Sequence, residues 1–340
     1  MRRTTKLLAI AATGAALVAT ALPATAITGG QPTGDGSFRN VALITFYAKD
    51  FEDETVYYRY RCTGTLVSPT VVLTAAHCTY ITGGATLVTF SPDVAPVAPP
   101  NNDPLLSPLP RAADDSATGP DGWGSSSTGF AHVGTTKGNQ KYYDWYKLTY
   151  GTTLENPTYY SGTAYKHPDY SNFTDLKNWN DVGVIVLDQE VEGIGTAPVA
   201  PQGFLDQFTP KVLNKTVFTP VGYGTEVRKP VAGPQKPTPM SYPLIRRVTT
   251  SNGQKLTPQI LQTNGNPNNN IGDGGTCFGD SGGPTFKDGY VVTVTSYGYT
   301  SNCRYLDGLQ RIDIPGVADI LADAIGDSGS VPANWELISR

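Results

Sequence analysis

Charged residues are scarce in this chain of 340 residues, where Asp, Glu, Lys and Arg together make up 16%. The 25 basic and 29 acidic side chains give a formal net charge of −4 and form no long run of one sign. Proteins that bind nucleic acid usually carry a strongly basic surface, so we expect no nucleic-acid partner. The 39% of apolar residues still suffices for one large core or two smaller ones.

Histidine and cysteine are also few, with three histidines and four cysteines in the whole chain. The cysteines form two groups that are close in sequence, Cys62 with Cys78 and Cys277 with Cys303. Neither group has the tight spacing of a zinc site, so we expect no bound metal. No other motif in the sequence calls for a cofactor, and none is expected.

The first 26 residues are typical of a secretory signal peptide. Three basic residues precede an Ala- and Leu-rich stretch, and Ala24-Thr25-Ala26 has the small residues that signal peptidase accepts. The alternative is a membrane anchor, but the stretch is short for the roughly 20 residues that cross a bilayer. No later segment is long enough to span a membrane. We therefore expect a secreted, extracellular protein that begins at Ile27, leaves the membrane after cleavage and forms disulfides.

The mature chain has the pattern of an all-β protein. Its 37 glycines and 27 prolines favour many turns between short strands and disfavour a helical bundle. The β-branched and aromatic runs that predict strands are 41–47, 55–60, 63–67, 71–74, 182–187 and 291–297. One helix is predicted from Pro315 to Gly326, where apolar residues recur at helical spacing. Two Pro-rich stretches, 91–129 and 229–243, are predicted to be loops.

Two short motifs carry the chemistry. Gly279-Asp280-Ser281-Gly282-Gly283-Pro284 surrounds a serine with glycines, which let the backbone turn tightly so that N–H groups converge beside the hydroxyl. Leu73-Thr74-Ala75-Ala76-His77-Cys78 places a histidine at the end of an apolar strand. A serine hydroxyl needs a base to take its proton, and the base needs a carboxylate to orient it. The two motifs therefore predict a nucleophile and its base.

Both motifs resemble, residue for residue, the serine and histidine blocks of the trypsin/chymotrypsin-type serine proteases. The family's aspartate block is similar to Asn180-Asp181 and the apolar run that follows it, so the resemblance makes Asp181 the third catalytic residue. The nearby Asp169, Asp175 and Asp188 are not followed by such a run. The order His77, Asp181, Ser281 is that of chymotrypsin-like enzymes and differs from the orders in subtilisins and α/β-hydrolases.

The resemblance covers most of the mature chain and implies its architecture. It predicts two antiparallel six-stranded β-barrels with a C-terminal helix, the catalytic residues lying in a cleft between them. We expect the first barrel within 27–201, including the Pro-rich insertion at 91–129, and the second barrel with the terminal helix within 202–340. That insertion either overhangs the cleft and narrows the substrate range or is a solvated loop without function. The resemblance also implies an oxyanion hole formed by the N–H groups of Gly279 and Ser281.

The sequence Ile27-Thr28-Gly29-Gly30 resembles the Ile-Val-Gly-Gly at which these enzymes begin once activated. The resemblance implies that the α-ammonium of Ile27 pairs with Asp280, the residue before the catalytic serine. Because the predicted signal cleavage falls directly before Ile27, we hypothesise that export itself creates the active terminus. The alternative is that signal peptidase cuts nearby and another protease trims the chain.

The cysteines and histidines gain roles from the same resemblance. A Cys62–Cys78 disulfide would brace the loop that carries His77, and a Cys277–Cys303 disulfide would tie the serine loop to the wall of the specificity pocket. His167, in a His-Pro pair upstream of Asp181, is predicted to be structural. His132 matches no family motif and is expected to be an ordinary partly buried or surface histidine.

Family spacing places Gly275 at the base of the specificity pocket, Ser296 along the cleft, and Gly298 and Gly308 at the two walls. Since trypsins have an aspartate at the first of these positions, its absence and the two wall glycines predict an apolar or aromatic preference. Asp307 leaves a second interpretation open, because a shift of one residue would point it into the pocket and restore a basic preference. Gln310 stands where a tyrosine is usual, and Tyr297 replaces a tryptophan.

The predicted function is that of a secreted serine endopeptidase, a monomer that acts on protein or peptide substrates through an acyl-enzyme. The contrasting prediction is a protease-like binding protein that has lost catalysis. Retention of His77, Asp181, Ser281 and Asp280 argues against that alternative, because a binding module has no need of all four. An esterase of the α/β-hydrolase fold disagrees with both the serine motif and the order of the three residues.

Overall fold

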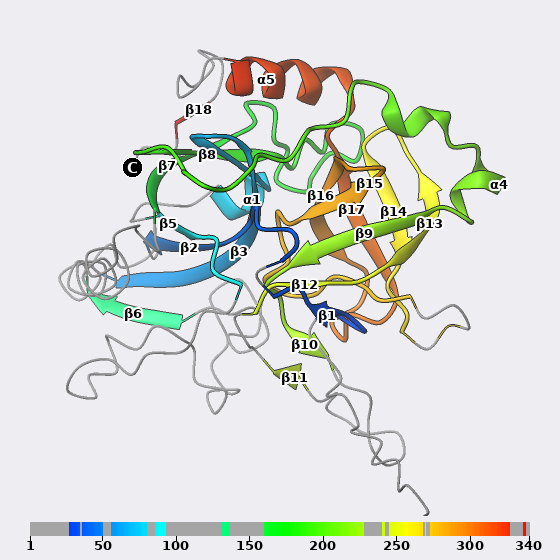
Figure 1. Cartoon of the computed structure of the whole chain (residues 1–340), viewed down its shortest axis with the longest axis horizontal. Coiled ribbons are helices and arrows are strands. Elements are labelled where there is room, and N and C mark those ends of the chain that lie inside the picture. The colour runs from blue at the N-terminus through cyan, green and yellow to red at the C-terminus, as the bar shows by residue number, and fades with distance from the viewer. Residues whose placement is uncertain are drawn as a thin grey trace, which may run out of the picture.

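The computed structural model describes residues 27–34, 36–49, 56–79, 86–92, 131–135, 160–227, 240–241, 245–267, 269, 273–326 and 336–337. The predicted signal peptide at 1–26 lies outside the described residues, as does the Pro-rich insertion except for Ser91 and Pro92. Two groups of strands stand side by side, with a helix running across one end of both (Figure 1). No helix within the described ranges is long and apolar enough to cross a membrane.

The first barrel is a closed ring of antiparallel strands. Its members pair in the order β2 (Val41–Lys49), β3 (Val56–Ser68), β4 (Val71–Thr74), β8 (Gly183–Leu187), β7 (Tyr160–Lys166) and β5 (Thr86–Thr89), and β5 returns to β2. Two further strands pair outside the ring, β6 (Ala131–Thr135) with β3 and β18 (Glu336–Leu337) with β7. Its interior is filled by buried apolar side chains that include Ile44, Phe46, Leu66, Val88 and Ile185.

The second barrel closes in the same way. Its ring order is β9 (Val217–Gly222), β13 (Ser251–Leu256), β14 (Ile260–Asn264), β17 (Leu306–Arg311), β16 (Tyr290–Gly298) and β15 (Pro284–Lys287), and β15 returns to β9. Outside the ring, β12 (Arg247–Val248) pairs with β9, and β1 (Gln31–Pro32) pairs with β12. The predicted pair of six-stranded antiparallel barrels is confirmed.

Helices are few among the described residues. The predicted C-terminal helix is α5 (Pro315–Gly326), and shorter ones are α1 (Ala76–Thr79), the 3₁₀ helix η4 (Phe204–Gln207) and α4 (Pro210–Leu213). Val317 and Leu321 of α5 lie in one buried cluster with Val184 of the first barrel and Val294 of the second. Each such side chain contributes about 1.5–3 kcal/mol when fully buried, so α5 holds the two barrels together.

One part of the second Pro-rich stretch departs from the loop prediction. Met240–Ser241 forms β11, which pairs with β10 (Glu226–Val227) in a separate two-stranded sheet. The boundary expected between 201 and 202 falls in the connection from β8 to β9, which carries η4 and α4. The termini of the described chain cross between the barrels, because β1 joins the second barrel and β18 joins the first.

A buried arginine fixes the N-terminal segment against both barrels. Arg246 is fully buried, and its guanidinium donates to the carbonyls of Val41 (3.2 Å), Phe90 (3.0 Å) and Gly34 (3.0 Å). Its Nε also donates to Thr33 Oγ1 at 2.9 Å. Buried charges are tolerated where hydrogen bonds satisfy them, so this residue holds the chain between Ile27 and β2 in one place.

Candidate active site

His77 and Asp181 meet because their strands are paired. β4 leads into α1, which carries His77, and β8 follows Asp181, with Thr74 directly opposite Gly183. His77 Nδ1 lies 2.8 Å from Asp181 Oδ2, and the His77 backbone N–H donates to Asp181 Oδ1, also at 2.8 Å. Asp181 is fully buried. A carboxylate in this position fixes the tautomer and direction of the ring, leaving His77 Nε2 to accept a proton.

The second barrel supplies a further hydrogen bond to the same carboxylate. Ser296 of β16 donates from Oγ to Asp181 Oδ2 at 2.5 Å, and Trp179 Nε1 donates to Ser296 Oγ at 3.0 Å. Ser296, expected to line the cleft, is buried and donates its hydroxyl hydrogen to Asp181. Asp181 therefore accepts three hydrogen bonds on its two oxygens, which hold the carboxylate in one orientation.

Two buried glutamines hold the backbone of Asp181 from the opposite side. The Asp181 N–H donates to Gln310 Oε1 at 3.1 Å, and Gln310 Nε2 donates to Gln259 Oε1 at 3.1 Å and to the Gln259 carbonyl at 3.2 Å. The Asn180 N–H donates to Gln259 Oε1 at 3.3 Å. We call Gln259 and Gln310 the glutamine pair. Sequence reasoning noted only that Gln310 replaces a tyrosine, because its partner Asp181 lies 129 residues away.

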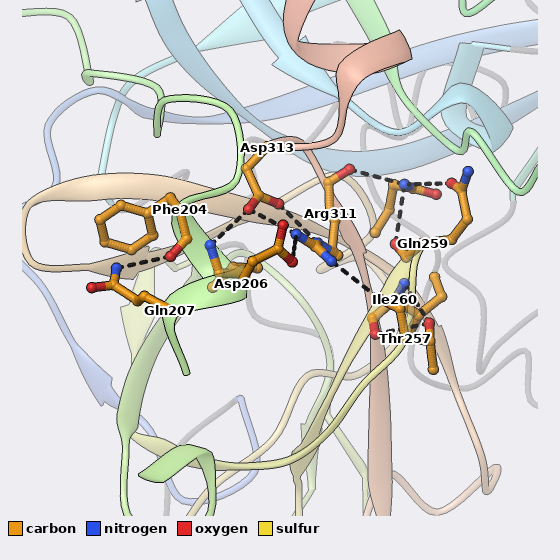
Figure 2. Close-up of polar contacts among 10 residues, drawn as sticks. Phe204, Asp206, Gln207, Thr257, Gln259, Ile260, Arg311 and Asp313 are labelled. Atoms are coloured by element: carbon orange, nitrogen blue, oxygen red, sulfur yellow. Dashed lines mark hydrogen bonds and ion pairs between the residues drawn. The ribbon is translucent and has the colours of Figure 1, made fainter. Parts of the chain in front are cut away.

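An ion-pair network supports the glutamine pair (Figure 2). Arg311 donates from Nε to Asp313 Oδ1 at 2.9 Å, from a terminal nitrogen to Asp206 Oδ1 at 2.7 Å, and to the Thr257 carbonyl at 3.3 Å. Asp313 Oδ2 in turn accepts from the Leu205 N–H at 2.7 Å. These bonds fix the end of β17, which carries Gln310, and the turn before Ile260, which carries Gln259.

Ser281 is packed against the strand that leads to His77. Its carbonyl accepts from the Thr63 N–H at 2.8 Å. A Cβ on Gly282 would overlap Thr74 Oγ1 and the Ala75 backbone, and Gly282 has a φ of +74°, so only glycine permits this approach. Among the described residues no hydrogen bond joins the Ser281 hydroxyl to the His77 ring. Catalytic hydrogen bonds are often long in the free enzyme and shorten once substrate binds.

The expected oxyanion hole has its N–H groups available. Gly279 adopts a φ of +94°, a conformation that favours glycine, and its carbonyl is held by Thr63 Oγ1 at 2.9 Å. Within the described ranges, neither the Gly279 nor the Ser281 N–H donates to a protein acceptor. Both donors are thus free to bind a developing negative charge beside the serine.

Asp280 is fully buried beneath the serine loop. Its carboxylate accepts from the N–H groups of Gly224 (2.7 Å) and Cys277 (2.9 Å). A Cβ on Gly222 or Gly224 would overlap the carboxylate, so both positions require glycine. Burial raises the pKa of Asp280 to about 7, against the opposing influence of the two N–H groups and of the Arg61 and Arg247 charges.

The N-terminal segment reaches the same region. Ile27 is fully buried, and Thr28 exchanges two backbone hydrogen bonds with Gly275, of 2.9 and 3.0 Å. In the uncut chain the Ile27 nitrogen is an amide bonded to Ala26, so the ion pair between Ile27 and Asp280 stays a prediction for the cleaved protein.

The two expected disulfides are formed, Cys62–Cys78 and Cys277–Cys303. The first joins β3 to α1 directly beside His77. The second joins the serine loop to the segment before β17. The sulfur atoms of Cys62 and Cys78 are therefore bonded to each other and are not thiolate ligands for a metal.

The wall of the expected specificity pocket differs from the arrangement that the apolar prediction assumed. A β-bulge between Thr295 and Tyr297 shifts the register of β16 on β17 by one residue, so Gly298 lies opposite Asp307. Gly308 lies opposite Tyr297, whose ring occupies the space that a Cβ on Gly308 would need. Asp307 Oδ2 accepts from the Thr276 N–H at 2.7 Å. The residue brought to the wall is thus Asp307 in place of Gly308.

A row of aromatic rings, unnoticed in the sequence, borders His77. The Phe173 ring lies 5.6 Å from the His77 ring and 5.2 Å from Trp179, which is 5.3 Å from Tyr297. Phe173 and its neighbour Asn172 have φ values of +61° and +48°, a strained conformation for residues with side chains. Strained backbone of this kind clusters at functional sites, and here it accompanies the contact of the Phe173 ring with the His77 ring.

The other two histidines lie apart from this site. His167 is buried; its Nδ1 accepts from the Asp169 N–H at 3.1 Å, and its Nε2 bonds to the Gly316 carbonyl at 3.3 Å. It thereby ties the start of α5 to the first barrel, in agreement with a structural role. His132 is in β6, opposite Tyr58 of β3.

Comparison with known proteins agrees with the two-barrel fold. The family model described as Trypsin matches residues 27–97 and 131–313. Among solved structures, human heparin binding protein is 16% identical with a TM-score of 0.51, over 89% of this chain and 98% of that one. HL collagenase is 15% identical with a TM-score of 0.51, over 87% of this chain and 97% of that one. These two similarities concern the fold alone. No curated protein sequence matches the chain.

Proposed function

Because the chain belongs to the trypsin family, we propose that it is a secreted serine endopeptidase with Ser281 as nucleophile, His77 as base and Asp181 as the residue that orients His77. The observation that carries the proposal is the His77–Asp181 pair, in which a fully buried carboxylate accepts both the backbone N–H and the ring Nδ1–H of the histidine. A protein that had lost catalysis would have no use for this arrangement.

The chemistry follows from these positions. His77 Nε2 takes the Ser281 proton as Oγ attacks the peptide carbonyl, and the carbonyl oxygen becomes an oxyanion bound by the Gly279 and Ser281 N–H groups. The imidazolium then gives its proton to the departing amine, which leaves an acyl group on Ser281. Water, deprotonated by His77, releases that acyl group as a carboxylic acid and restores the serine.

The test is covalent labelling with a biotinylated fluorophosphonate, which reacts with activated serines. We expect stoichiometric labelling of Ser281 in the secreted protein, loss of labelling in Ser281→Ala, and a strong reduction in His77→Ala. Ser301→Ala, at an exposed serine away from the triad, is the matched control and should label as the wild type does. Absence of label in folded wild-type protein would instead support the binding-protein alternative.

Activation is the second element of the proposal. Signal cleavage before Ile27 would free an α-ammonium that pairs with Asp280, so that the buried carboxylate gains a cation in addition to its two N–H donors. The buried position of Ile27 and the pairing of Thr28 with Gly275 support this, since they bring the segment to the serine loop.

N-terminal sequencing of the protein from the culture medium checks the cleavage site, and Asp280→Asn checks the ion pair. We expect Ile27 as the first residue and a large loss of labelling in Asp280→Asn. A fully active protein that starts elsewhere, or an active Asp280→Asn variant, would refute this part while leaving the endopeptidase proposal standing.

A further inference from the structure

Two buried arginines lie against the serine loop, and the proposed catalytic mechanism uses neither of them. Arg61 belongs to β3 of the first barrel, and Arg247 belongs to β12 beside the second. They are only 7% and 5% exposed. Taking a guanidinium out of water is costly unless an acid or several acceptors compensate its charge. Their directions in the fold point to Asp280 as an acid that they compensate.

The direction of Arg247 follows from strand pairing. Arg247 lies directly opposite Gly222 of β9. Residues directly opposite in an antiparallel pair point their side chains to the same face of the sheet. On that face a Cβ built on Gly222 would overlap Asp280 Oδ1. The Arg247 side chain therefore extends over the face of the sheet on which the Asp280 carboxylate lies.

Arg61 reaches the serine loop from the other barrel. Alternate residues of a strand share a face, so Arg61 points the same way as Thr63, whose Oγ1 donates to the Gly279 carbonyl at 2.9 Å. A Cβ built on Gly279 would lie 2.9 Å from Arg61 Nε. A terminal nitrogen of Arg61 donates to Thr225 Oγ1 at 3.4 Å. The guanidinium thus adjoins the residue that precedes Asp280.

These arginines act on Asp280 while the chain is still uncut. The Ile27 nitrogen is then an uncharged amide, bonded to Ala26. The charges of Arg61 and, less strongly, Arg247 oppose the rise in the pKa of Asp280 that burial causes. Asp307 of β17 is the acid that feels the Asp280 charge in turn. Asp280 therefore has part of its charge compensated from two strands before any α-ammonium is available.

We propose that Arg61 and Arg247 are positioning residues that keep Asp280 charged and thereby hold the serine loop, with its oxyanion N–H groups, formed before the chain is cut. This inference rests on the proposed endopeptidase function. It also limits what cleavage adds, because the α-ammonium strengthens an arrangement that the arginines already support. The uncut protein therefore has serine reactivity of its own.

The experiment compares two forms of the protein, one that starts at Ile27 and one that starts at Ala24. Both are labelled with fluorophosphonate, and mass spectrometry after the reaction verifies each N-terminus. We expect the Ala24 form to label more slowly than the Ile27 form, but at about a hundredth of its rate or faster. Because the added residues leave no ammonium on Ile27, this labelling depends on the internal cations.

Removing one arginine charge should matter most where Asp280 is only partly ionised. Arg247→Gln raises the pKa of Asp280 further, so labelling of the Ala24 form at pH 7 should fall by about fivefold or more. The loss should shrink at pH 9, where the acid is charged in both proteins. It should be less than about threefold in the Ile27 form, whose α-ammonium supplies another cation.

Further variants separate charge from shape. Arg247→Lys keeps the charge and should recover most of the lost rate, whereas Arg61→Gln should behave as Arg247→Gln does. Arg39→Gln, at an exposed arginine, is the matched control and should label as the wild type does. An Ala24 form that is inert while the Ile27 form labels would overturn the proposal. A loss in Arg247→Gln that is the same at pH 7 and pH 9 would do so as well, because it would show a purely structural role.

Failure of both forms to label would overturn the endopeptidase proposal, and urea unfolding would then decide on the arginines without turnover. In the Ala24 form with Ser281→Ala, the added change Arg247→Gln should lower the urea midpoint more at pH 9 than at pH 5. The physical reason is that Asp280 is charged at the higher pH and protonated at the lower. Equal shifts at the two pH values would overturn the role of Arg247.

Discussion

Asp181 and Asp307 are two buried aspartates with opposite surroundings. Asp181 accepts hydrogen bonds from the His77 backbone, the His77 ring and Ser296, all within the protein. Asp307 accepts from Thr276 and has no cation beside it in the described structure. The comparison teaches that burial alone does not define the role of an acid. Asp181 is held in one orientation by several internal donors, whereas Asp307 has a single backbone donor and no neighbouring cation among the described residues.

Replacing the internally bonded acid should have the largest effect. In Asp181→Asn the side chain can no longer orient His77 in the tautomer that accepts the Ser281 proton, so kcat/KM should fall by about 10⁴-fold for every substrate alike. Steady-state kcat/KM values for two peptides that differ only in having Arg or Phe before the cleaved bond check this. A loss of kcat/KM confined to the Arg peptide would contradict this prediction, because it would show that Asp181 acts on substrate preference and not on the orientation of His77.

The two acids should also differ in what they do to stability. The pKa of Asp307 is raised in the folded protein, so the folded state holds the proton more tightly than the unfolded state. Stability is therefore lost as pH rises from about 4 through about 8. Asp307→Asn removes this dependence. The free energy of unfolding of Asp307→Asn minus that of the wild type should therefore be roughly 1–3 kcal/mol larger at pH 9 than at pH 4.

Urea unfolding of both proteins at the two pH values measures the difference. Asp288→Asn, at an exposed carboxylate, should leave the pH dependence of the wild type unchanged. A wild type whose stability relative to Asp307→Asn is the same at pH 4 and pH 9 would show that Asp307 is already paired in the free protein.

The glutamine pair, Gln259 and Gln310, allows a test of how the backbone of Asp181 is held in place. Gln310→Leu leaves the Asp181 N–H and the Gln259 side chain without their partner, at a cost of about 1–3 kcal/mol in the free energy of unfolding. We expect kcat to fall by about tenfold, with KM nearly unchanged, because the aspartate is less firmly placed. Gln207→Leu, at an exposed glutamine, is the control. An unchanged kcat in folded Gln310→Leu would make the pair purely structural.

His167, whose ring bonds to the Asp169 N–H and the Gly316 carbonyl, should give the smallest effect. Burial lowers its pKa, opposed by the Gly316 carbonyl and Asp169 and assisted by the Lys166 charge. A lowered histidine pKa means that the unfolded state binds the proton more tightly, so stability present above about pH 6.5 is lost as pH falls below it. Thermal unfolding from pH 7.5 to 5 should show a steeper loss in the wild type than in His167→Gln, by about 1 kcal/mol. Identical pH profiles would contradict this.

Local patterns made most of the fold predictable and pointed to the three proposed catalytic residues. Alternating β-branched runs marked the strands, the spacing from Val317 to Ile325 marked α5, and His77, Asp181 and Ser281 each lie in a short motif whose chemistry is local. The cysteines near two of these motifs led to the disulfides that the structure contains. Features of this kind depend on neighbours in sequence, and sequence therefore reveals them.

The arrangement of the pocket wall and the hydrogen bonds that hold Asp181 could not be predicted from the sequence, because they depend on contacts between residues far apart in the chain. The sequence left two registers open at the pocket wall, and the bulge between Thr295 and Tyr297 that places Asp307 opposite Gly298 could not be read from the residue types. The bond from Asp181 to Gln310 spans both barrels, and the left-handed backbone at Phe173 is unusual for an aromatic residue. Each follows from tertiary packing, which overrides local preference.

Trapping the acyl-enzyme tests most directly whether Ser281 is the nucleophile, because the acyl group of the substrate becomes covalently bonded to it. The purified secreted protein would be mixed with matched Arg and Phe peptide thioesters, quenched in acid within milliseconds, digested and analysed by mass spectrometry. We predict an acyl group on Ser281 from at least one of the two thioesters. No adduct on Ser281 from either thioester, in protein shown to be folded, would contradict the account.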